Sequence, residues 1–171
     1  MPVKDTKFEF YKPNYFHGTI QQVANELSHI DEKGKFPNDK IPMIFLFERF
    51  EQKWIKDAYS NLEREAEIIL IFLTKAKFNE FSTKDLYSHC VKPMQKLLYH
   101  FVLALENSKI IKTRPSLEDY KTINESKFGV YTDTKGTEKN LFSDNLSGIE
   151  FTISLEILKS DCSCNDDKCV C

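Results

Sequence analysis

The sequence has few glycines and no excess of charge of either sign. Only 5 of its 171 residues are glycine, and it contains no P-loop, dinucleotide fingerprint or zinc-protease motif. Its 24 Lys and Arg side chains are balanced by 26 Asp and Glu side chains, so no strong field is available to steer nucleic acid. The composition therefore excludes a dedicated polybasic nucleic-acid binder and gives no support to phosphate-binding chemistry.

Long apolar runs are also absent. The N-terminal stretch MPVKDTKFEFYK has no apolar signal core, and the longest run, IILIFL at 68–73, is far too short to span a bilayer. We therefore expect no membrane partner and expect the protein to stay where it is made. In a reducing cytosol its five cysteines would be thiols or metal ligands rather than disulfides.

The N-terminal half predicts one helix followed by two strands within a single domain. Apolar residues three or four apart predict an amphipathic helix over 20–30, and Thr19 with Gln22 forms a capping box at its start. A strand is expected over 43–50, after a proline that suits a strand entrance. Residues 67–76 are apolar at consecutive positions, which indicates a central strand covered on both faces and paired with the strand before it.

A long helical pattern begins at Ser82 and is interrupted by Pro93. Either the helix bends there, or a second helix begins with Pro93 in its first turn and runs to about residue 107. Cys90 has His89 beside it, as a nucleophile and base would. However, Cys90 lies on the apolar stripe of the helix, so we interpret it as a buried, inert thiol.

The C-terminal half predicts a β-hairpin. Residues 109–126 have little periodicity and read as a loop or a weak edge strand. Residues 127–134 and 147–159 are expected to pair, because apolar and polar residues alternate from Ile149 to Ile157. The polar connection between them is long for a hairpin, so we expect it to project as a functional loop.

The order of elements predicts an α+β fold, with a four-stranded, largely antiparallel sheet and its helices packed on one face. The other face would present polar residues of the last strand to solvent or a partner: Glu150, Thr152, Ser154 and Glu156. We divide the chain into an N-terminal arm (1–16), one α+β domain (17–159) and a flexible, cysteine-rich tail (160–171).

The tail DCSCNDDKCVC carries the one constellation with a specific chemistry. Its four thiols could place tetrahedral ligands on zinc; they are Cys162, Cys164, Cys169 and Cys171. A single residue between paired cysteines strains such a chelate, however, so an unligated tail without a cofactor is the preferred interpretation. Zinc binding and oxidative cross-linking are the alternatives. Acidic side chains such as Glu48 and Glu51 read as a solvated rim, so no enzymatic activity is expected.

Several strings of the sequence resemble the tail completion or tail terminator proteins of tailed bacteriophages, particularly those of phages of Bacteroidota. The resemblance covers most of residues 15–158. It depends on an opening strand, a second apolar strand ending near Phe78, the end of the long helix, and two later strings. The segments that carry the resemblance include PMIFLFE (42–48), LENS (105–108), FGVY (128–131) and LFSDNLSGIE (141–150).

This resemblance implies a structural virion protein of the neck, assembled in the host cytoplasm. Such subunits form a ring, typically a hexamer, that ends the tail tube and joins it to the head connector. The partners implied are other copies of the chain, the tail tube protein, neck proteins, and the sheath protein if the tail is contractile, with DNA only passing through the lumen. The loop 132–147 is the natural contact segment, with Leu141, Phe142, Asp144 and Asn145 as its candidate residues.

Two alternatives stay open. One is another neck component, such as a head completion or connector adaptor protein. The other is a small thiol-rich metal-binding protein, because the cysteine tail is no part of the family pattern.

Overall fold

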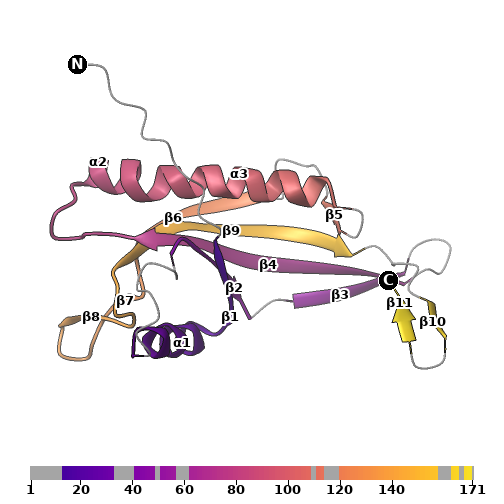
Figure 1. Cartoon of the computed structure of the whole chain (residues 1–171), viewed down its shortest axis with the longest axis horizontal. Helices are drawn as coiled ribbons and strands as arrows, with labels where there is room; N and C mark the ends of the chain where they lie inside the picture. The colour runs from indigo at the N-terminus through magenta and orange to yellow at the C-terminus, as the bar shows by residue number, and fades with distance from the viewer. Residues whose placement is uncertain are drawn as a thin grey trace, which may run out of the picture.

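The computed structural model is a mixed sheet with helices packed against it (Figure 1). It describes residues 13–32, 41–48, 51–56, 62–108, 111–113, 120–157, 163–165 and 168–170. The α+β class is confirmed, but the expectation of four strands is wrong. Within the described residues the sheet has seven: β1 (Asn14–Gly18), β2 (Met43–Phe47), β3 (Glu51–Lys56), β4 (Leu62–Lys75), β5 (Ile111–Thr113), β6 (Tyr120–Phe128) and β9 (Leu146–Ile157).

Two long strands, β4 and β9, form the centre of this sheet. They pair antiparallel over their length, from Arg64 opposite Ile157 to Lys75 opposite Leu146. The other edge of β4 is shared by β2 and β3, and the other edge of β9 by β5 and β6. Among the strand pairs that the structure describes in this sheet, only β1–β2 is parallel, so the largely antiparallel character is confirmed. The strand predicted at 67–76 is the central one and pairs with its predecessor β2, but it starts earlier.

The helices cover opposite faces of the sheet, so their expected packing on one face is wrong. α1 (Ile20–Glu32) lies on one side, and α2 (Thr83–Leu86), the π-helical turn η1 (Tyr87–Val91) and α3 (Lys92–Glu106) lie on the other (Figure 1). In β4, Ile71 and Leu73 pack in the cluster that contains α1, whereas Leu70 and Phe72 pack in the cluster that contains α3. The consecutive apolar residues of β4 make both of its faces apolar, and each face therefore needs a cover.

The start of α1 is fixed by the predicted capping box. The backbone N–H of Thr19 donates to Gln22 Oε1 at 2.7 Å, and the backbone N–H of Gln22 donates to Thr19 Oγ1 at 3.3 Å. Two backbone donors at the helix end are thereby satisfied. Val23, Ala24 and Leu27 are buried on the face that meets the sheet.

Pro93 lies in the first turn of α3. This agrees with the second of the two alternatives, in which a second helix begins with Pro93 in its first turn. The turn before it is π-helical, and the backbone N–H of Lys92 donates to the carbonyl of Tyr87, five residues back. A π turn is a common way to accommodate an irregularity without ending a helix. As a result α2, η1 and α3 run on as one rod (Figure 1). Ser82, where the helical pattern was predicted to begin, caps the rod together with Asp85.

The predicted C-terminal hairpin is wrong beyond Phe128. Residues 120–128 form β6, an edge strand of the main sheet that pairs with β9 as far as Phe128 opposite Leu146. Gly129 then takes a φ of 81°, which an L side chain rarely adopts, and the chain leaves the sheet. The following strands, β7 (Val130–Thr132) and β8 (Glu138–Asn140), pair with each other as a separate ribbon.

Both ends of the domain contain more regular structure than the sequence suggested. Residues 14–16, placed in the N-terminal arm, belong to β1, and the Phe16 side chain is in the core. In the tail, β10 (Ser163–Asn165) and β11 (Lys168–Val170) pair antiparallel. Cys162 and Cys171 lie outside the described residues.

Candidate functional site

The loop predicted to contact partners is fastened to the core of its own chain. Phe142 is only 5 % exposed, and its ring stacks on Phe128 with centroids 5.5 Å apart. A Cβ on Gly129 would overlap the Phe142 ring, so the turn and the ring fit only because residue 129 is glycine. Leu141 packs partly buried on the same cluster. Phe142, a predicted contact residue, therefore has most of its apolar surface already covered within its own chain, and its role toward a partner stays a prediction.

The two polar candidates of this loop hold its shape. Asp144 forms an ion pair with Lys75 of β4, and the carbonyl of Asn145 accepts from the backbone N–H of Ala76 at 2.8 Å. Asn140 Nδ2 donates to the Asp144 carbonyl at 3.2 Å and to Asn145 Oδ1 at 3.1 Å. Asp144 and Asn145 therefore both make contacts within their own chain. Their role in binding a partner stays a prediction.

The part of the predicted loop that does project is the β7–β8 ribbon (Figure 1). Asp133 closes its turn, since Asp133 Oδ1 accepts from the backbone N–H groups of Lys135 at 2.9 Å and Thr137 at 3.0 Å. The bond from Thr137, the Lys139 side chain and the bond from Lys135 together lower the pKa of Asp133. The ribbon is therefore a formed hairpin, with Tyr131 exposed on it.

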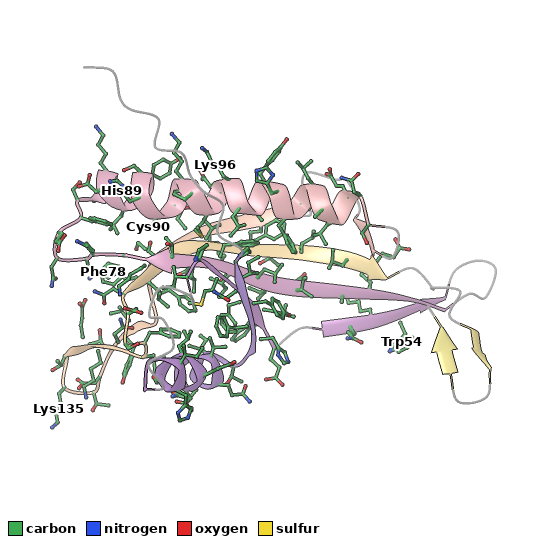
Figure 2. All side chains as sticks on the ribbon, viewed as in Figure 1. Trp54, Phe78, His89, Cys90, Lys96 and Lys135 are labelled. Atoms are coloured by element: carbon green, nitrogen blue, oxygen red, sulfur yellow. The ribbon has the colours of Figure 1, made fainter. Side chains whose placement is uncertain are left out.

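A basic surface runs along the outer side of the long helix. Residues 86–105 contain no Asp or Glu, and a shallow hollow of about 510 Å³ on this side is lined by Lys92, Gln95, Lys96, Tyr99 and His100. The Tyr99 side chain is 62 % exposed, and Lys96 points away from the sheet (Figure 2). We call this surface the basic helix face: Tyr87, His89, Lys92, Lys96, Tyr99 and His100.

The sheet presents the opposite charge on its other side. α1 packs over the end of that side where Ile71, Leu73 and Leu146 lie. Farther along β4, and on β9 and β6 beside it, no helix within the described residues packs on this side of the sheet, and strand register brings polar side chains together there. Among side chains that the structure describes, five glutamates and two lysines lie on this side, which we call the open sheet face: Glu65, Glu67, Glu125, Glu150 and Glu156, with Lys53 and Lys121. Glu156 is buried, whereas the other six are at least partly exposed.

Two glutamates of the open sheet face repel each other. Glu125 lies on β6 opposite Gly148, two residues from Ile123, which is opposite Glu150. Partial burial, and then the nearby Glu150 carboxylate, raise the pKa of Glu125. Desolvation and a like charge both disfavour the ionised form of a carboxyl group. A cation brought to this position would relieve the repulsion.

Large aromatic side chains are also exposed at the edges of the sheet. Tyr15 on β1 is 61 % exposed and Trp54 on β3 is 60 % exposed. Trp54 lies at the end of the molecule distant from α1 (Figure 2). Aromatic residues are enriched in protein interfaces, where they contribute a large contact area at low entropic cost.

The thiols are of two kinds. Cys90 is fully buried, as predicted, and its Sγ contacts the Lys75 carbonyl at 3.8 Å; burial raises the pKa of this thiol, against a smaller lowering by a hydrogen bond with Ser147. In the tail, strand register places Cys164 directly opposite Cys169. Within the described residues, no group of three or more His, Cys, Asp or Glu side chains is arranged to hold a metal.

The sequence-based reasoning missed the basic helix face, although its signal is in the sequence. A twenty-residue acid-free helical segment is unusual in a chain where acidic residues slightly outnumber basic ones. The open sheet face had been foreseen only along β9. Its glutamates on β4 and β6 join it through the register of three strands, which the sequence does not reveal.

In the part of the chain that the structure covers, no helix combines the length and apolar character needed to cross a membrane. Comparison of the chain with protein-family models, with curated proteins and with solved structures gave no match. The function therefore has to be inferred from the surfaces described above.

Proposed function

We propose that this chain is a structural subunit of a tailed-phage neck, which assembles into a ring on the head-proximal end of the tail tube. The ring would end tube growth and join the tube to the head connector. The chain would act by geometry rather than by catalysis, through surfaces that meet other copies of itself and the neighbouring rings.

The observation that carries this proposal is the exposure of large aromatic side chains on separate sides of one small domain. Tyr99 lies on the outer side of the helix, whereas Tyr15 and Trp54 lie on strands β1 and β3, and each is at least 60 % exposed. A ring subunit needs contacts on several sides, two with its lateral neighbours and others along the axis. Aromatic side chains exposed at several places on the surface match that requirement better than one deep pocket would.

The test is to measure the mass of the purified full chain by light scattering, image it in negative stain, and add it to polymerising tail tube protein. We expect rings with a central hole, and tubes that stop growing when the chain is present. A chain that stays monomeric and leaves tube length unchanged would contradict the proposal. A twelvefold ring that binds head connector protein rather than the tube would favour the head-side alternative.

The Cys164–Cys169 register favours one second candidate, a thiol-based metal-binding function. Residues opposite each other on antiparallel strands have their Cα atoms within about 4.5–5.5 Å. Zinc analysis with thiol titration would separate the two functions. One zinc per chain and four protected tail thiols would support metal binding, whereas four freely reactive tail thiols would remove it.

A further inference from the structure

We infer that the subunits associate head to tail, the basic helix face of one copy docking on the open sheet face of the next. This inference rests on the proposed ring and identifies the surfaces that form it. The occupant of the open sheet face is therefore a second copy of the same chain.

The first step is the position of the two faces. The long helix packs on one side of β4 and β9, through Leu70 and Phe72. The glutamates of the open sheet face lie on the other side of the same strands, in register with one another. The two faces thus point in opposite directions from one sheet (Figure 1). Surfaces on opposite sides of a subunit produce a heterologous contact, which closes into a ring when the rotation between copies allows it.

The second step is charge. Among the described side chains of the open sheet face that are at least partly exposed, Glu65, Glu67, Glu125 and Glu150 outnumber Lys53 and Lys121. The basic helix face has Lys92 and Lys96, in a segment without acidic residues. Two helix faces, or two sheet faces, would repel each other. The contact between unlike faces is the one that complementarity favours, and it also excludes the symmetric alternatives.

The third step is the apolar contribution. Ile123 is 38 % exposed on β6, opposite Glu150 and between Lys121 and Glu125. On the helix, Tyr87 and Tyr99 stand among the lysines, and Tyr99 lines the shallow hollow with Lys92 and Lys96. Each face therefore has apolar side chains within its charged surface, the arrangement of a protein interface with a polar rim.

The fourth step is the unfavourable environment of Glu125. Its carboxyl group is partly buried beside the Glu150 carboxylate. A lysine arriving from a neighbouring subunit would compensate this repulsion, so ionisation of Glu125 would cost less in the assembly than in the single chain.

The experiment uses two charge-reversed full-length chains. One carries Lys92→Glu and Lys96→Glu, which makes its helix face acidic. The other carries Glu67→Lys and Glu150→Lys, which makes its sheet face basic. Each chain alone would then present two like-charged faces, so we expect its association to weaken at least about tenfold relative to the unchanged chain. Mixed in equal amounts, the two chains should assemble in alternation, because each contact in the mixture joins unlike faces.

The measurement is sedimentation velocity of each chain and of the mixture, at low salt and at about 0.5 M salt, where charge contacts are screened. A chain with Glu26→Lys is the control, because it reverses an exposed charge on α1, outside both faces, and should assemble normally. Circular dichroism checks that every variant is folded.

The outcomes are distinguishable. Rings that form equally well from each reversed chain would overturn the docking inference and leave the proposed function standing. Co-assembly restricted to the mixture would support the inference. If the unchanged chain and the mixture both stay monomeric, the docking and the ring are contradicted together. If only the mixture associates, the contact is supported and the ring is not.

Discussion

The two faces of the β4–β9 pair are built from alternate residues of the same two strands, yet they have different surroundings. On one face Leu70, Phe72, Phe151 and Ile153 are buried under the long helix. On the other, Ile71 and Leu73 are buried near α1, but farther along β9 come Thr152 and Ser154, which remain partly exposed. Within the described residues, β4 and β9 thus bury apolar side chains under the long helix on one face, whereas on the other face they bury them at one end only. The rest of that face is available for contacts.

The largest expected effect tests the covered end of the second face. A Cβ on Gly148 would overlap the carbonyl oxygen of Phe72 across the ladder, so Gly148→Ala must push β4 and β9 apart. We expect a loss of more than about 5 kcal/mol of stability, or no folded protein. Ser154→Ala, on the same side of β9 within the open part, should change stability by less than about 0.5 kcal/mol. Urea unfolding followed by circular dichroism measures both. Equal effects would remove the distinction between the two ends of this face.

The next effect tests the face under the long helix. The Phe72 ring is fully buried and contacts Phe101 edge to face, with centroids 5.6 Å apart. Phe72→Ala should cost about 3–5 kcal/mol, from lost apolar burial and the cavity left behind. Thr152→Ala in the neighbouring strand, on the open side, is the matched comparison and should be close to neutral. Loss of less than about 1 kcal/mol in Phe72→Ala would show that the helix is not held by this face.

A smaller effect concerns the thiol between helix and sheet. Only the thiolate reacts with alkylating reagents, and burial raises the pKa of Cys90. In a chain whose four tail cysteines are replaced by serine, we therefore expect Cys90 to resist iodoacetamide at pH 8 until the protein is unfolded. Mass spectrometry with and without urea provides the measurement. Rapid labelling of the folded chain would mean that the helix opens readily from the sheet.

The smallest effect concerns Glu125 on the open sheet face. The pKa of Glu125 is raised in the folded chain, so its contribution to stability is present at acid pH and is lost as pH rises through that pKa. Glu125→Gln should therefore be as stable as the unchanged chain under acid conditions. At neutral pH it should be more stable by no more than about 0.5 kcal/mol, because exposed charge pairs are screened. Thermal melts of the monomeric chains at several pH values test this. A variant less stable at neutral pH would show that Glu125 has a favourable partner within its own chain.

Where sequence-based prediction succeeded, the signal was local. The capping box of Thr19 and Gln22, the start of the long helix at Ser82, and the alternation along β9 each depend on residues a few positions apart. The burial of Cys90 followed from its place on a helical stripe. Prediction was wrong on the number of strands, on the side of the sheet that each helix covers and on the pairing beyond Phe128, all of which depend on distant partners. For β6 the sequence left open a loop or a weak edge strand, because its residues are mostly polar, and the edge strand forms because β9 offers it a free edge.

The sequence by itself determined the periodicities, the caps, the apolar strand β4 with its two faces, and the acid-free helical segment. Only the tertiary structure decided that α1 and α3 take opposite faces, that Phe142 turns into the core, and that glutamates from β4, β6 and β9 share one surface. The physical reason is that local hydrogen bonding and periodicity fix which residues share a side of an element. Which elements then meet depends on covering apolar surface contributed by residues distant in the chain.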